Sequence, residues 1–227
     1  MENIFLNQIN LNFKKPKLLI HICCAPDLVV PLKDLKESFE LYLYWYNPNI
    51  QPFSEYKKRY KEYIKLLNLE KWDYKLVDSS GNIVDKFEDK IYNDYDNREF
   101  YDKLIEHRKI WNLDNLPEKD LLSLYAKMEE KNSPRCDICY YFRLLEPAKV
   151  AKKLWIKYFT TTLLISPKKS VEKLNKYWKQ VSNEVWVKYL SFNFRRNNWF
   201  KKAAEYTKQY NIRRQNYCGC AWSIRNS

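Results

Sequence analysis

Glycine is almost absent from this chain, which has only Gly81 and Gly219 among its 227 residues. Loops that bind nucleotide phosphates need several glycines, because their backbone amides must approach the phosphate closely. A conventional phosphate-binding loop is therefore excluded.

The chain also lacks a long hydrophobic segment. No apolar run approaches the roughly 20 residues of a membrane-spanning helix. The N-terminal stretch "MENIFLNQINLNFKKPK" has no compact hydrophobic segment followed by a cleavage site. We therefore expect a cytoplasmic protein without a membrane partner. Disulfides are disfavoured in that compartment, so the six cysteines indicate metal ligation or redox chemistry.

Acidic residues are outnumbered by basic ones, and the formal net charge is +13. Such an excess favours a nucleic-acid partner, because Lys and Arg release condensed counterions from phosphates. The chain is also rich in Lys, Asn, Ile and Tyr, a composition that biased codon usage would produce without such a partner. The charge by itself leaves both explanations open.

Short apolar runs alternate with amphipathic segments along the chain. We expect strands at 17–22, 40–46, 72–78, 157–165 and 184–190. We expect helices at 27–39, 54–69 with Ser54 as its N-cap, 137–154, 171–178 and 199–209. This alternation predicts an α/β fold, a Rossmann-like parallel sheet with helices on both faces.

Residues 85–133 break this rhythm, because they are highly charged and contain "EHRKIWNLDNLPEKD". We expect them to form a mostly helical insertion. The sequence shows no internal repeat and no low-complexity linker, so we expect one domain over residues 1–227.

The six cysteines occur as three close pairs. Cys23 and Cys24 follow the first predicted strand, where ligand sites form in parallel sheets, and Asp27 comes shortly after them. A second pair, C-x-x-C, opens a predicted helix, where the helix dipole and nearby Arg135 and Arg143 favour ionised thiols. In the third pair, C-x-C, the central Gly219 permits backbone angles that let both sulfurs converge. The second and third pairs are Cys136 with Cys139 and Cys218 with Cys220.

Three simpler explanations account poorly for these pairs. A structural Cys₄ zinc site uses four thiols and leaves two unexplained. Independent placement of core cysteines would not generate three close pairs, and disulfides do not suit the compartment. Six thiolates and Asp27 are too many for one tetrahedral ion, but they suit a cubane held by four cysteines beside a second metal. The spacing indicates a polynuclear metal site.

Five segments in order resemble the epoxyqueuosine reductases of the QueH type: "LLIHICCAPD", "YWYNPNIQPFSEYKKR", "RCDICYYFRL", "FTTTLLISP" and "RQNYCGCAWS". Together they run through most of the chain. The stretch 103–128 is longer than the family pattern, so we assign no functional residue there.

The resemblance implies the last step of queuosine biosynthesis, which is independent of cobalamin. At the wobble position (34) of tRNA, two electrons and two protons convert the epoxide of epoxyqueuosine to an alkene and water. It further implies a [4Fe-4S] cluster, an adjacent mononuclear iron and an external low-potential electron donor.

The resemblance also implies roles for particular residues. Asp27 is expected to be catalytic, as an oxygen ligand of the lone iron. His21 is expected to be structural. The metal ligands would be Cys23, Cys24, Asp27, Cys136, Cys139, Cys218 and Cys220. The substrate would be contacted by Tyr46, Asn47, Thr161, Thr162, Ser166, Arg214, Gln215 and Tyr217. Ordinary strand packing explains Thr161 and Thr162 equally well, and a core position beside the cluster explains Tyr217 equally well.

Two other functions compete with this one. An iron–sulfur tRNA thiolase would need an ATP-binding loop rich in Gly and Ser, and none is visible. A nucleic-acid-binding zinc protein without catalytic activity would differ from both enzymes in the metal that it binds.

Overall fold

A six-stranded sheet forms the centre of the fold. The computed structural model describes residues 14–50, 53–69, 73–85, 134–166, 169–192, 198–220 and 223. The strand order is β4-β3-β2-β1-β5-β6, and all neighbours are parallel except β3 and β4. The strands are β1 (Lys17–Ile22), β2 (Glu40–Trp45), β3 (Tyr74–Val77), β4 (Ile83–Val84), β5 (Tyr158–Thr161) and β6 (Lys188–Tyr189).

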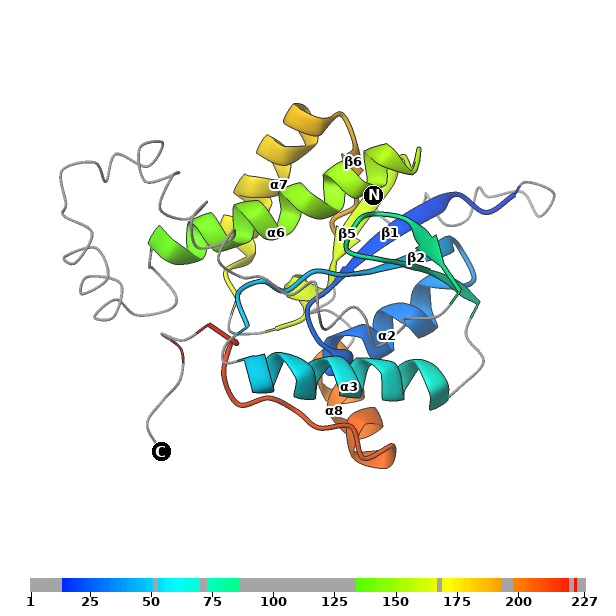
Figure 1. Cartoon of the computed structure of the whole chain (residues 1–227), viewed down its shortest axis with the longest axis vertical. Coiled ribbons are helices and arrows are strands. Elements are labelled where there is room, and N and C mark those ends of the chain that lie inside the picture. The colour runs from blue at the N-terminus through cyan, green and yellow to red at the C-terminus, as the bar shows by residue number, and fades with distance from the viewer. Residues whose placement is uncertain are drawn as a thin grey trace.

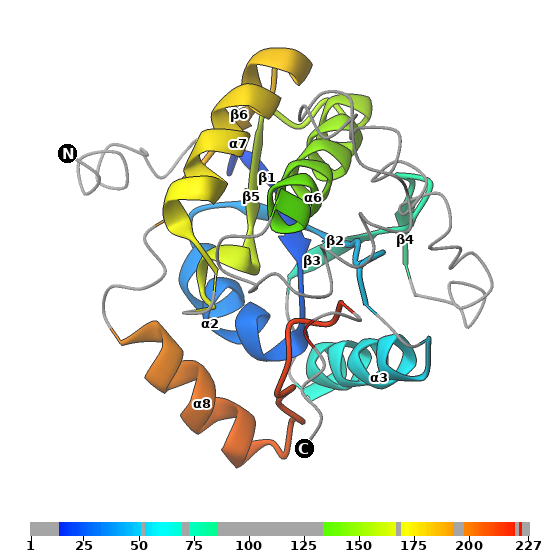
Figure 2. The same ribbon diagram turned by 90° about the vertical axis from the view of Figure 1, so that its left-hand side faces the viewer.

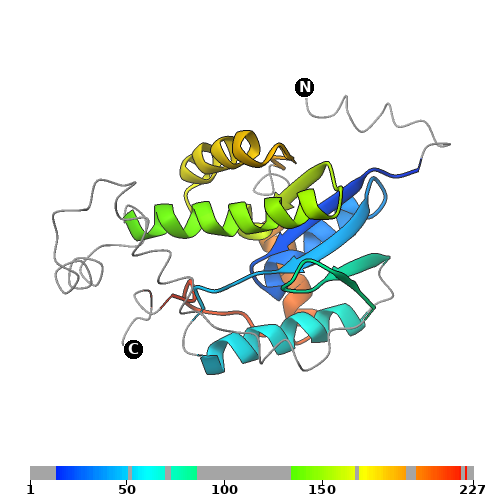
Figure 3. The ribbon, with the colours of Figure 1, turned by 45° about the horizontal axis from the view of Figure 1, so that its top comes forward.

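Helices cover both faces of this sheet, as the predicted α/β fold requires. One face carries α6 (Pro134–Lys153) and α7 (Val171–Val185), which pack against each other (Figure 1). The other face carries α2 (Ala25–Leu35), α3 (Phe53–Leu69) and α8 (Trp199–Gln209), as Figures 2 and 3 show. The described residues therefore form three layers, helix–sheet–helix.

The central strand β1 is covered on both faces. Leu18, Leu19 and Ile20 are fully buried, which explains why the strand reads as a continuous apolar run. The buried exception is His21, whose ring nitrogens are hydrogen-bonded to Thr161 Oγ1 (2.7 Å) and the backbone oxygen of residue 46 (2.8 Å). Burial and the nearby Arg143 guanidinium lower the pKa of His21 to about 3. His21 is neutral and fully hydrogen-bonded, in keeping with the structural role expected of it.

Aromatic residues attach α3 to the sheet. Tyr56, Tyr60 and Tyr63 are buried on one helical face, as their spacing predicts. The Trp45 indole, at the end of β2, stacks on Tyr63 with ring centroids 5.1 Å apart. Its Nε1 donates a hydrogen bond to Tyr56 Oη (2.9 Å). These contacts fix α3 against the end of β2.

Several predicted boundaries were wrong. Ser54 lies within the first turn of α3 rather than at its N-cap, since that helix begins at Phe53. The predicted strand 157–165 ends at Thr161, and a 3₁₀ turn, η3 (Thr162–Leu164), follows it. The predicted strand 184–190 is reduced to β6, because the apolar stripe of α7 continues to Val185.

The antiparallel strand β4 was not predicted. It contains only two residues, too few to show a strand's alternating pattern. The turn that leads into it is closed by a hydrogen bond, in which the backbone amide of Asn82 donates to Asp78 Oδ1 (2.7 Å). Gly81 occupies this turn with φ of 76°, a conformation that favours glycine. Residues 86–133, which contain all of the predicted insertion except position 85, lie outside the described residues.

Length and hydropathy bear on the membrane prediction. None of the helices in the described ranges is both long enough and apolar enough to cross a membrane.

Trp186 ends α7 in a left-handed conformation, with φ of 65°, and its side chain is 87% exposed. This conformation costs a residue with a Cβ about 1 kcal/mol or more, whereas glycine adopts it without strain. We expect Trp186→Gly to raise the free energy of unfolding by about 0.5 kcal/mol, because glycine's greater chain entropy offsets part of the gain. Urea denaturation measures this. Trp186→Ala keeps the Cβ and should give no gain in the free energy of unfolding. An equal gain from Trp186→Ala would show that the effect comes from removing the indole ring.

Candidate active site

Two thiols and a carboxylate meet where β1 ends. Cys23 and Cys24 connect β1 to α2, and Asp27 lies in the first turn of that helix; all three side chains are buried. Cys23 Sγ is 3.2 Å from Asp27 Oδ2 and 3.8 Å from Cys24 Sγ. One ligand atom from each of the three residues lies within 4.8 Å of the others, an arrangement able to hold a metal ion.

Thr162 fixes the position of Cys23. The Cys23 amide donates to Thr162 Oγ1 (2.9 Å), and this hydroxyl donates to Cys23 Sγ (3.0 Å). On the other side, Gln215 Nε2 donates to Cys24 Sγ (2.9 Å). The two adjacent thiols are therefore oriented by different segments of the chain.

A second group of thiols forms between α6 and the C-terminal segment. Cys136 and Cys139 lie in the first two turns of α6, as the C-x-x-C pattern predicted. Cys139 and Cys220 both lie close enough to Cys218 for their pKa values to respond to its charge. Lys169 Nζ donates a hydrogen bond to Cys218 Sγ.

Gly219 allows the C-x-C segment to pass close to α3. Its φ is 117°, and a Cβ at this position would come within 3.0 Å of both Arg59 Nη1 and Ile50. The positive φ and these close contacts would strain a larger residue between Cys218 and Cys220. The role that the sequence suggested for this glycine agrees with its surroundings.

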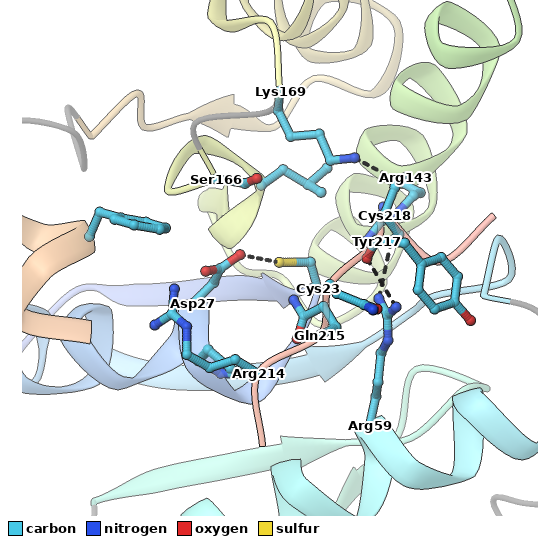
Figure 4. Close-up of a pocket in the computed structure, with 14 residues that line it drawn as sticks. Cys23, Asp27, Arg59, Arg143, Ser166, Lys169, Arg214, Gln215, Tyr217 and Cys218 are labelled. Carbon is cyan, nitrogen blue, oxygen red and sulfur yellow. Dashed lines mark hydrogen bonds between the residues drawn. The ribbon is translucent and has the colours of Figure 1, made fainter. Parts of the chain in front are cut away.

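One thiol from each group, Cys23 and Cys218, lines a common cavity (Figure 4). Cys23 contributes from the β1–α2 connection, Asp27 from α2, and Cys218 from the C-terminal segment. Asp27 is the single carboxylate among the residues that line it, against four basic side chains. These are Arg59, Arg143, Lys169 and Arg214. The cavity is thus strongly basic.

Burial and charge act in opposite directions on the acidic groups. Burial raises the pKa of Asp27, although Cys23 and Arg214 partly oppose this. Burial likewise raises the pKa of Cys139, even though Arg143 acts in the direction that the sequence suggested. At Cys218 a hydrogen bond from Cys220 lowers the pKa, burial opposes this, and the Lys169 ammonium adds to the lowering. Buried thiols of this kind ionise readily when a metal supplies positive charge.

Arg59 links α3 to the C-terminal cysteines. It is 3% exposed and donates to the backbone oxygens of Tyr217 and Cys218, both at 3.1 Å. Its guanidinium also lies 4.9 Å from the centre of the Tyr217 ring. Glu55 pairs with Arg59 at 2.8 Å and with Arg213 at 3.0 Å. Sequence analysis missed this role, because Arg and Glu four residues apart on a helix are usually a solvated pair.

Four of the eight residues expected to contact the substrate line the cavity. They are Ser166, Arg214, Gln215 and Tyr217. Lys169 and Phe200 also line it and were not predicted. Lys169 follows the predicted "ISP" segment closely, and this proximity was the available signal.

The other four are not among the residues that line the cavity. Thr161 is hydrogen-bonded to His21, and Thr162 is hydrogen-bonded to Cys23. The Asn47 amide donates to the Ile22 carbonyl (2.7 Å) and accepts from Arg143, and the Tyr46 ring stacks on Tyr44. Their contact with substrate stays a prediction.

The donor chemistry of the site fits a metal cofactor. Soft thiolates with a single hard carboxylate suit iron–sulfur centres and transition metals, whereas Mg²⁺ and Ca²⁺ require mainly oxygen ligands. The buried group Cys23–Cys24–Asp27 is compatible with metal binding.

Comparison with known proteins agrees with this chemistry. The family model described as Epoxyqueuosine reductase QueH matches residues 18–226. The chain is 31% identical over 207 residues to Epoxyqueuosine reductase QueH of Thermotoga maritima, covering 91% of this chain and 90% of that one. It is 31% identical over 218 residues to the protein of that name from Staphylococcus epidermidis, covering 96% and 80%. The chain therefore belongs to the family described as Epoxyqueuosine reductase QueH.

Proposed function

We propose that this chain is an epoxyqueuosine reductase that acts on the wobble base of tRNA and completes queuosine. The observation that carries the proposal is the buried group Cys23–Cys24–Asp27, two of whose members, Cys23 and Asp27, line one basic cavity together with Cys218. Family membership supplies the reaction: the epoxide gives up its oxygen as water, takes two electrons and two protons, and leaves an alkene.

The cofactors in this proposal are a [4Fe-4S] cluster and one further iron, held by the six cysteines and Asp27. When bound, they supply the two electrons, delivered from an external low-potential donor, and a Lewis acid for the epoxide. Cys136 and Cys139 would both bind the cluster. Each of the other two cysteine pairs would give one sulfur to the cluster and one to the lone iron, with Asp27 as its oxygen ligand.

The chain's own residues bind and orient the substrate in this scheme. Four basic side chains around the cavity attract the phosphates of the anticodon loop. Ser166 and Gln215 offer hydroxyl and amide groups to the modified base inside the cavity. Thr162 and Gln215 hold Cys23 and Cys24 in fixed directions, so the reacting site changes little on binding.

Iron and sulfide analysis, together with turnover, tests this function. Anaerobically prepared protein should contain more than four irons and about four sulfides per chain. Asp27→Ala should keep the sulfides but lose the extra iron and most of the reductase activity, whereas Cys136→Ala should lose the cluster. A single zinc without sulfide would instead support the zinc-protein alternative. Full iron and full turnover in Asp27→Ala would overturn the two-centre assignment.

Arg59 offers a second test, because it holds the carbonyls of Tyr217 and Cys218. We expect Arg59→Met to fold, as far-ultraviolet circular dichroism checks, but to keep less than half of its iron. Arg213→Met is the matched control: it removes the more exposed partner of the same Glu55 but none of the hydrogen bonds by which Arg59 holds the two carbonyls, and should retain its iron. Equal iron content in the two variants would show that Arg59 does not position the ligands.

The basic cavity predicts a steep salt dependence of tRNA binding. Each phosphate contact adds close to one unit to the slope of log K against log salt. We expect Arg214→Gln to reduce that slope by about one unit. Lys188→Gln, in β6, should leave it unchanged. An affinity that does not respond to salt would mean that the basic charge has no part in binding tRNA.

A further inference from the structure

Phe200 is an exposed aromatic residue at the rim of the cavity. Five large apolar side chains are exposed in the described part of the chain, and among them Phe200 alone lines the cavity. Phe200 is 45% exposed, whereas its neighbour Trp199 is buried. The start of α8 therefore packs one aromatic ring inward and presents the next to solvent at the cavity.

Arg214 joins Phe200 from a different segment. Its guanidinium carbon lies 5.0 Å from the centre of the Phe200 ring. The same guanidinium acts on the charge of Asp27, and Figure 4 shows the two side chains next to each other. The Phe200–Arg214 pair therefore lines the same cavity as the carboxylate of the candidate metal centre, with Arg214 beside that carboxylate.

Positive charge surrounds this pair. Lys201 and Lys202 follow Phe200 and are exposed. On the other side lies the basic cavity itself. Proteins that bind unstacked nucleotides combine cations along the phosphate backbone with aromatic or guanidinium planes on which bases stack.

We propose that Phe200 and Arg214 form a stacking platform for the nucleobase next to the modified wobble base. This inference rests on the proposed function. To bring its cyclopentane ring to Asp27, the modified base must leave the stack of the anticodon loop and enter the cavity. The adjacent base then loses a stacking partner. A ring and a guanidinium plane at the rim replace that partner and hold the loop in register.

Binding of an anticodon stem–loop RNA with guanosine at the wobble position tests the platform in the metal-loaded protein. We expect Phe200→Leu, which stays apolar but has no π-face, to weaken binding about tenfold. Phe200→Tyr should bind like the original chain. Trp186→Leu is the control, because it removes an exposed aromatic residue that does not line the cavity.

A double-mutant cycle identifies the stacked base. Stem–loops with an abasic site directly before or after the wobble position should show one position where the original chain loses about tenfold in affinity and Phe200→Leu loses nothing further. Equal losses of affinity in both proteins, or unaltered binding by Phe200→Leu, would overturn the platform. The proposed function would still stand if the original chain binds the stem–loop and reduces epoxyqueuosine. If the original chain neither binds the stem–loop nor reduces epoxyqueuosine in tRNA, the proposed function fails and the platform with it.

Discussion

The paired hydrogen bonds between Cys23 and Thr162 are the constraint on which the site depends. They join the carboxyl ends of β1 and β5, two adjacent parallel strands, at the points where the chain leaves the sheet. Since β1 is buried on both faces, its end has little freedom to move. The first thiols are therefore placed by a buried strand of the sheet, and the second group is positioned by α6 and the C-terminal segment.

Electrostatics explains why such a site needs so many partners. Burial raises the pKa of Asp27 and of Cys139, because a low-dielectric environment disfavours charge. Arg143 and Lys169 compensate in part, and each of them also makes a structural contact, to Asn47 or to Cys218. The positive charge of the cavity therefore has two effects: it stabilises thiolates, and it would attract a phosphate-bearing substrate.

The fold followed from the sequence where the hydrophobic pattern was strong. The bounds of β1 and α8 were predicted correctly, because an uninterrupted apolar run and a clear helical period leave one interpretation. The predicted strand at 184–190 was wrong, because Val185 and Val187 suit either a strand or a helix. The left-handed turn at Trp186, which assigns Val185 to α7, has no signature in a residue of that type.

The sequence by itself determined the chemistry: three cysteine pairs with Asp27, the strand end at which they start, and the family to which their order belongs. Only the tertiary structure decided which side chains meet. Arg59, Lys169 and Phe200 come from three segments distant from Cys23, and local sequence patterns carry no information about contacts between elements. Conversely, Thr161 and Asn47 stand in the expected motifs, but their hydrogen bonds turn inward, because buried polar groups must find partners within the protein.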